Sequence, residues 1–204
     1  IFDWDGTLID SIDWIVYCLQ QAALQCNLEA SSAREAKNVI GLSIQNAMRT
    51  LFPDVDAITL SKLVSAYSDT YFSKTLSRND LFVGAYQCLT HLKNQGFLLA
   101  VATGKTRVGL NEALKSTITE DLFVATRCAD ETASKPDPQM ITEILNVTGL
   151  DKSQTLLVGD SIHDIQMAHN AGISAIAVSC GANTSDELER YQPVLCLSEF
   201  IELQ

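Results

Sequence analysis

The sequence predicts an α/β protein: a doubly wound parallel sheet with an all-helical domain inserted after the first strand. Short apolar runs alternate with segments of helical periodicity over most of the 204 residues. Residues 11–77 break this alternation, because they show helical periodicity and no convincing strand. Polar residues follow several of the apolar runs, at the sheet edge where open α/β folds bind their ligands.

The strands of the core are expected from apolar runs of consecutive β-branched and aliphatic residues. Such runs are typical of strands covered on both faces of a parallel sheet. Helical spacing separates them, for example at Cys88, Leu89 and Leu92. The six runs are Ile1–Phe2, Phe97–Ala102, Leu122–Ala125, Thr155–Val158, Ser174–Val178 and Val194–Leu197.

The inserted segment is expected to form a small helical domain that leans on the core. One apolar stripe begins at Ile12, with Asp10 or Ser11 placed to cap it, and a second follows Leu60 at helical spacing. Between them Ser43 can start a shorter helix. The predicted division is therefore a core of residues 1–10 and 78–204 and a helical cap of residues 11–77.

Composition limits the function. The 14 Lys and Arg against 25 Asp and Glu give a formal charge of −11, which disfavours nucleic-acid binding. An anionic substrate would also be repelled, which favours a bound metal at the site.

No apolar run approaches a membrane span and no secretory signal is seen, so a cytoplasmic protein without membrane contact is expected. Six scattered cysteines indicate reduced, buried thiols, and the start at Ile1 suggests further native residues upstream.

The first polar segment is Ile1–Leu8, in which Asp3 and Asp5 stand where a strand runs into a glycine turn. Residues two apart on a strand point the same way. Two carboxylates on one face repel each other unless a cation lies between them or one is protonated. One could act as a nucleophile and the other as a proton donor.

Two further segments suit phosphate. Thr103 and Gly104 end an apolar run before a helix, where free N–H groups bind anions and glycine permits close approach. Lys135 is followed by Pro136, which holds the backbone extended and can aim the ammonium at a phosphoryl oxygen. Taken singly, an ordinary turn and a solvated lysine remain open.

The fourth segment follows the run that ends at Val158. It delivers Asp160, with Asp164 four residues later at the start of a helix. Magnesium prefers hard oxygen ligands and few carboxylates, and Asp160 can supply one. Asp164 is placed either to accept a hydrogen bond from groups around the metal without binding the metal itself, or to cap the helix. His163 is either a surface residue or faces the substrate.

Together the four segments resemble the haloacid dehalogenase-like hydrolase superfamily. The shared pattern is D-x-D-G-T, a Ser or Thr after an apolar strand, a Lys, and G-D-x-x-x-D, and all four parts are intact here. The resemblance covers essentially the whole chain. The helical insert resembles the cap of phosphoglycolate phosphatases, β-phosphoglucomutases and their relatives.

The resemblance implies a phosphatase that works through a phosphorylated aspartate. Asp3 would be the nucleophile, and Asp5 the acid that protonates the leaving alcohol and then the base that activates water. Mg²⁺ would be held by Asp3, the Asp5 backbone carbonyl and Asp160, with Asp164 in support. The phosphate would be bound by Thr103, Gly104 and Lys135.

The resemblance implies a phosphate ester as substrate. A helical cap that closes over the site favours small phosphomonoesters, with phosphoglycolate-like acids or sugar phosphates ahead of phosphoproteins. A sugar phosphomutase, a pyrophosphatase and a catalytically silent binding module stay open, as does the oligomeric state. Gly41, Leu42 and Ser43 lie where relatives bring the cap over the active site. Arg34 and Arg49 are the cap arginines that could bind a substrate carboxylate.

Overall fold

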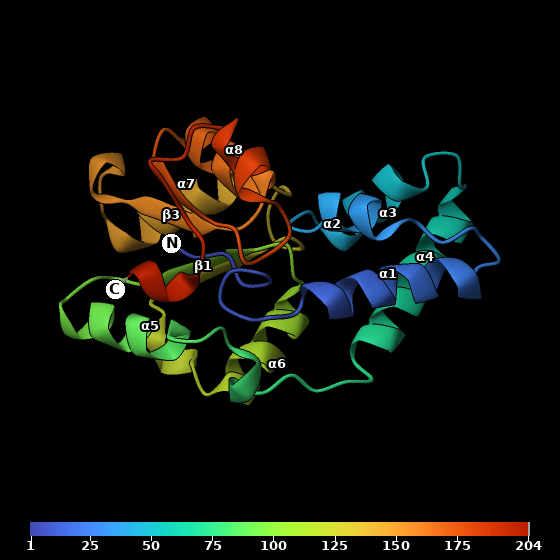
Figure 1. The fold of residues 1–204 in the computed structure, drawn as a ribbon, viewed down its shortest axis with the longest axis horizontal. Helices are drawn as coiled ribbons and strands as arrows, with labels where there is room; N and C mark the ends of the chain where they lie inside the picture. The colour runs from blue at the N-terminus through green and yellow to red at the C-terminus, as the bar shows by residue number, and fades with distance from the viewer. Residues whose placement is uncertain (204) are drawn as a thin grey trace.

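The computed structural model describes residues 1–203 and has two lobes (Figure 1). The larger lobe is built around parallel strands, as predicted. The strands are β1 (Ala100–Thr103), β2 (Ala125–Cys128), β3 (Leu156–Gly159), β4 (Ser174–Val178) and β5 (Leu195–Leu197). Strand β1 pairs with β2, and β3, β4 and β5 pair in that order. Phe2 bridges Val101 and Val158 in parallel, so the N-terminal segment joins the two groups into one sheet.

One predicted strand is displaced. The run Leu122–Ala125 was expected to be extended, but Glu120–Leu122 form a short 3₁₀ turn and β2 begins at Ala125. Strand β2 pairs only with β1, so its Thr126 and Arg127 are half-buried at the sheet edge and bond to side chains of neighbouring helices. These polar residues broke the apolar pattern that marks the central strands.

Helices cover both faces of the sheet, as a doubly wound fold requires. Alternate strand residues face opposite sides: Val101, Val158 and Ile176 pack in one apolar cluster, and their neighbours in sequence pack in another. The first cluster contains side chains of α5 (Ala85–Asn94) and α6 (Arg107–Thr117). The second contains those of α7 (Gln139–Thr148), α8 (Ile162–Ala171) and α9 (Ser185–Glu189).

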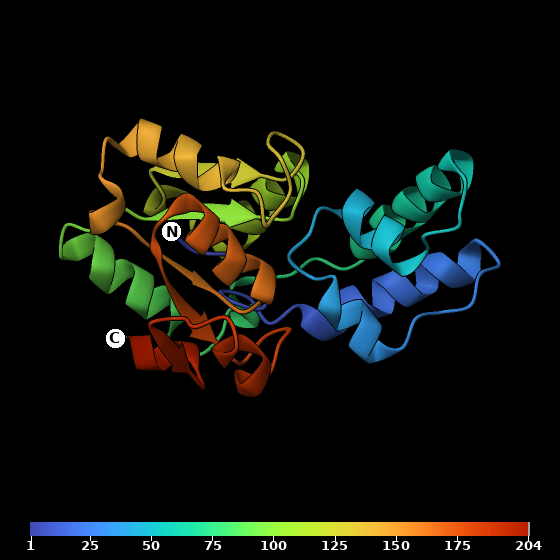
Figure 2. The same ribbon diagram turned by 90° about the horizontal axis from the view of Figure 1, so that it is seen from above.

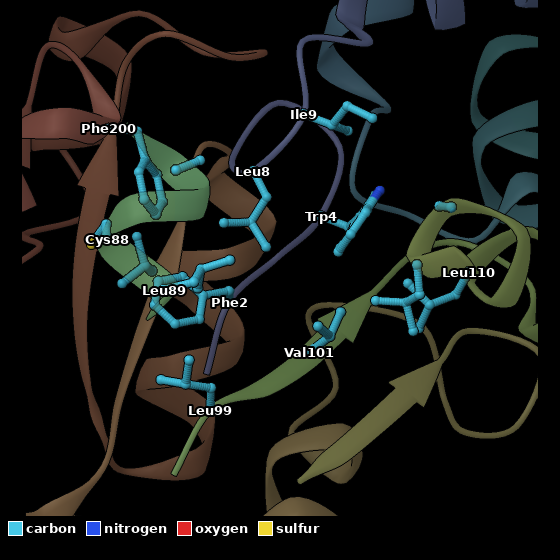
Figure 3. Close-up of a cluster of buried hydrophobic side chains, with 14 of the residues drawn as sticks. Phe2, Trp4, Leu8, Ile9, Cys88, Leu89, Leu99, Val101, Leu110 and Phe200 are labelled. Atoms are coloured by element: carbon cyan, nitrogen blue, oxygen red, sulfur yellow. The ribbon is translucent and has the colours of Figure 1, made fainter. Parts of the chain in front are cut away.

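The first cluster fixes the segment that carries Asp3. Phe2, Trp4 and Leu8 are buried in it, and the Phe2 and Phe200 rings lie 6.0 Å apart (Figure 3). Fully burying one such side chain contributes roughly 1.5–3 kcal/mol. The polar residues at positions 3 and 5 therefore alternate with anchored apolar ones. Short 3₁₀ turns complete this lobe at Arg78–Asp80, Lys152–Gln154 and Phe200–Leu203.

The smaller lobe consists of α1 (Ile12–Gln25), α2 (Ala33–Asn38), α3 (Ile44–Leu51) and α4 (Ala57–Tyr71), and stands at one end of the core (Figure 2). It has its own apolar cluster, formed almost entirely by residues of this lobe. The expected stripes on α1 and α4 and the Ser43 cap of α3 are confirmed. Helix α2 was not expected, because it buries only Ala36 and so lacks an apolar stripe.

Two connections lie side by side where the lobes meet. Ile9 bridges Leu81 in antiparallel fashion, and the Asp10 N–H donates to the Asp80 carbonyl at 2.8 Å. The helical lobe is therefore joined to the core by a paired hinge just past Asp5. The predicted domain division at residues 10 and 78 remains a prediction, which this hinge supports.

Within residues 1–203, no helix is long and apolar enough to cross a membrane.

Candidate active site

The four polar segments meet at one edge of the sheet. Phe2 lies between β1 and β3, and its successor Asp3 donates its N–H to the Val158 carbonyl at 2.9 Å. Asp3 therefore leaves the sheet between Thr103, at the end of β1, and Asp160, just after β3. All three side chains are buried.

Lys135 links two acids in this cluster. Its Nζ lies 2.7 Å from Asp3 Oδ1 and 2.7 Å from Asp164 Oδ1, and its side chain is fully buried. Burial by itself lowers the pKa of Lys135, but Asp164 and Asp3 outweigh it, so the pKa lies above its usual value. Lys135 is thus a buried cation aimed at Asp3, not the solvated loop lysine that its sequence context allowed.

Asp164 both supports the cluster and stabilises the start of α8. Ser161 is the N-cap of that helix, and Asp164 Oδ2 accepts from the Ser161 N–H at 3.1 Å and from its hydroxyl at 2.6 Å. The expected N-cap role of Asp164 is therefore corrected: Ser161 is the N-cap, and Asp164 closes the capping box. Its support of a metal ligand stays a prediction.

Asp160 is oriented by tight contacts. Thr7 Oγ1 donates to its Oδ1 at 2.7 Å, and the Ala182 N–H donates to its Oδ2 at 2.7 Å. A methyl group on Gly6 or Gly181 would lie 2.2 or 2.1 Å from Asp160 Oδ2, so only glycine leaves room for this carboxylate. Burial, reinforced by Asp164, raises the pKa of Asp160 to about 7.

The acid cluster fits a divalent cation. Oxygens of Asp3, Asp160 and Asp164 lie within 4.8 Å of one another, and Lys135 is the buried ammonium among them. Burial raises the pKa of Asp3 well above its usual value despite Lys135, and Asp3 Oδ1 accepts no hydrogen bond of good geometry. Buried carboxylates in excess of their counter-charge are costly, and hard carboxylate oxygens suit Mg²⁺.

Asp5 points away from that cluster, toward the helical lobe. Its Oδ1 accepts from the Ser11 hydroxyl at 2.7 Å. Lys105 Nζ lies 3.0 Å from Asp5 Oδ1 and 2.9 Å from Oδ2, and donates to the Tyr71 hydroxyl at 2.6 Å. The predicted metal contact of Asp5 would therefore have to come from its backbone carbonyl, because its carboxylate is engaged elsewhere.

The helical lobe closes directly over this edge. An added Cβ at Gly104 would lie 2.5 Å from the Leu42 carbonyl oxygen and 2.7 Å from that of Gly41. The Ser43 N–H donates to Ser134 Oγ at 2.8 Å, next to Lys135. Residues 41–43 therefore lie against Gly104 and Ser134, which supports the expectation that they cover the active site.

A cavity of about 90 Å³ lies between the lobes, above Asp3. The core contributes Asp3, Asp5 and the turn from Thr103 to Thr106. The helical lobe contributes mainly aliphatic and aromatic side chains. They include Ile15, Leu19, Val39, Ile40, Leu42, Ile44, Ala47, Tyr67, Tyr71 and Phe72.

The arginines proposed to bind a carboxylate do not line this cavity. Arg49 is exposed, and Arg34 is an exposed residue 3.8 Å from Glu187. Both lie on polar faces of their helices. His163 does not line the cavity either, and its Nε2 contacts the Asn38 carbonyl at 3.0 Å where the lobes meet.

Sequence reasoning missed the pair formed by Lys105 and Tyr71. Lys105 follows Gly104 directly, which was the available signal, but its partner Tyr71 comes from the far end of the insert. Only the closed arrangement of the lobes brings the two together.

The fold and site define a hydrolase of the haloacid dehalogenase type. Residues 1–178 match the family model described as haloacid dehalogenase-like hydrolase, and the chain belongs to this family.

Two curated relatives span almost the entire chain. The probable phosphatase IndB of Dickeya dadantii is 31% identical over 207 residues, covering 100% of this chain and 90% of that protein. The phosphoglycolate phosphatase of Pectobacterium atrosepticum is 29% identical, covering 99% and 88%. A hydrolase from Pseudomonas syringae has the same fold, with a TM-score of 0.89 at 20% identity over 99% of this chain and 94% of that one.

Proposed function

We propose that this protein is a magnesium-dependent phosphatase that hydrolyses a small phosphomonoester through a phosphorylated Asp3. The observation that carries the proposal is the position of Asp3. It lies at the base of the cavity, 2.7 Å from the buried Lys135 and within a cluster of acids that fits a divalent cation.

Asp3 would attack the phosphorus atom, forming an aspartyl-phosphate as the bond from phosphorus to the ester oxygen breaks. Lys135, Thr103 and the backbone at Gly104 would bind the non-bridging oxygens, because Lys135 Nζ lies 2.7 Å from Asp3 and Thr103 and Gly104 line the cavity with Asp3. Each contact that strengthens as charge develops can contribute about 3–4 kcal/mol.

Asp5 would donate its proton to the departing alkoxide and later accept one from the water that attacks the phosphoenzyme. Ser11 and Lys105 hold its carboxyl in position. Mg²⁺, held by Asp3, Asp160 and the Asp5 carbonyl, would supply positive charge beside the phosphate.

The proposal is tested by turnover of p-nitrophenyl phosphate. We expect activity with Mg²⁺, none in EDTA, and recovery when Mg²⁺ is restored. Asp3→Asn should be inactive while its circular dichroism and melting temperature stay close to those of the parent protein. A fully active protein in chelator, or a variant with a tenth of the parent activity, would contradict the proposal.

A further inference from the structure

We infer that the leaving group of the substrate is a small, uncharged and mainly apolar alcohol. The inference rests on the proposed phosphatase function and concerns the part of the substrate that the helical lobe covers. It departs from the phosphoglycolate-like acids that were among the expected substrates.

The wall facing the phosphate site is apolar. Helix α1 contributes Ile15 and Leu19, and the segment before α3 contributes Val39, Ile40 and Leu42. Such a surface gains free energy by covering apolar atoms. A carboxylate placed against it would lose its hydration without gaining a cationic partner, which is costly.

The cations of the helical lobe point elsewhere. Arg34 lies near Glu187, Lys37 is 3.8 Å from Asp13, and Lys74 lies 5.5 Å from the centre of the Trp14 ring. The two others, Arg49 and Lys62, are exposed. Among the residues lining the cavity, the described part of this lobe supplies no positive charge.

Lys105 is the cation that does line the cavity, and its hydrogen-bonding capacity is used. An ammonium has three donors. Lys105 Nζ makes three contacts, two to the Asp5 carboxylate and one to the Tyr71 hydroxyl. A substrate carboxylate could bind Lys105 only by displacing Asp5, the proposed proton donor, or Tyr71.

The polar groups on the wall are neutral. Ser68 Oγ already donates to the Val64 carbonyl at 2.9 Å. The Tyr67 ring stacks on Tyr71 at 5.8 Å, and among the described residues its hydroxyl makes no hydrogen bond. Tyr67 can therefore donate one hydrogen bond to an oxygen of the leaving group, but it supplies no positive charge to offset a carboxylate.

The cavity also limits size. An apolar cavity of about 150 Å³ accommodates benzene. The present cavity of about 90 Å³ must hold the leaving group next to the phosphate, so a leaving group no larger than a single ring is expected.

A matched substrate pair tests the inference. Isobutyl phosphate has the branched end of phosphoglycolate without its negative charge. With Mg²⁺ present, we expect kcat/KM for isobutyl phosphate to exceed that for phosphoglycolate by about tenfold or more. The reverse order, or a hexose phosphate that outranks isobutyl phosphate, would overturn the inference and leave the phosphatase function intact. Hydrolysis of neither these esters nor p-nitrophenyl phosphate would overturn both, whereas hydrolysis of p-nitrophenyl phosphate alone would overturn only the inference.

A variant pair tests whether the wall is responsible. Leu42 is half-buried and lines the cavity beside Gly104, so a long side chain there can direct its end to the cavity or to solvent. Leu42→Lys should raise the ratio of kcat/KM for phosphoglycolate over isobutyl phosphate by about tenfold relative to Leu42→Met, which has similar length and no charge. Equal ratios in the two variants would show that the wall does not select the leaving group.

Discussion

Adding one methyl group at Gly104 should separate the two lobes at the active site. The added Cβ in Gly104→Ala would lie 2.5 Å from the Leu42 carbonyl oxygen and 2.7 Å from that of Gly41. Ordinary contact begins at 3.4 Å, so the Leu42 carbonyl must retreat by the difference of about 0.9 Å. Both obstacles are backbone atoms, so no side-chain rotation relieves the clash.

This displacement lies where it matters most for catalysis, since Leu42 and Gly104 both line the cavity. A misplacement of about 1 Å can cost roughly 10²-fold in rate. We expect kcat/KM of Gly104→Ala with p-nitrophenyl phosphate to fall about 10²-fold. The melting temperature should change little, because the open arrangement relieves the clash while the core stays packed.

Gly109→Ala is the matched control. It also lines the cavity, but its added Cβ would meet Thr106 Oγ1 at an ordinary 3.4 Å and Phe72 at 3.9 Å. Within α6 the change should add about 0.5–1 kcal/mol of stability with activity within a few-fold of the parent. If Gly104→Ala kept more than half of the parent activity, the closed contact would not belong to the catalytic state.

Two further changes probe the buried charges. Lys105→Met should lower the free energy of unfolding by about 3 kcal/mol, because removing one partner of a buried ion pair leaves the Asp5 carboxylate without its counter-charge. Urea denaturation measures this loss. A loss below about 0.5 kcal/mol would mean that the pair is not formed in solution. The pKa of Asp160 is raised to about 7, so the folded protein binds its proton more tightly than the unfolded chain. Without metal, stability should therefore fall as pH rises from about 4 to 7, and Mg²⁺ should raise the melting temperature more at pH 7 than at pH 5. An equal rise at both pH values would contradict the assignment of Asp160 to the metal site.

The sheet and its catalytic edge could be predicted because they depend on local patterns. In β4, for example, the four residues after Ser174 are all buried, so the strand is a run of consecutive apolar residues. Asp3 and Asp160 directly follow or end such strands, and parallel strands bring those ends together. The order of strands and polar residues along the chain was therefore enough to predict that these side chains meet at one edge of the sheet.

Elements that depend on tertiary contacts could not be predicted in this way. Strand β2 lies at the sheet edge, and its residues Thr126 and Arg127 are polar and half-buried. The strand was therefore placed on the neighbouring apolar run instead. Helix α2 depends on the capping box of Ser32 and Glu35 rather than on an apolar stripe.

The residues that line the cavity could not be predicted from the sequence either. An acidic substrate was among those expected and would have needed Arg34 or Arg49 as its partner, but both arginines lie away from the cavity. Composition shows how many cations a segment has and not which way they face. The pairing of Lys105 with Tyr71 likewise depends on how α4 sits over the core.

The most direct test of the account is to trap the covalent intermediate. The Mg²⁺-loaded protein is mixed with ³²P-labelled substrate and quenched in acid within one turnover, and the labelled peptide is identified by mass spectrometry. The account predicts one acid-stable phosphoryl group on Asp3, absent from Asp3→Asn. A label on another residue, or full turnover with no covalent phosphate at any quench time, would contradict it.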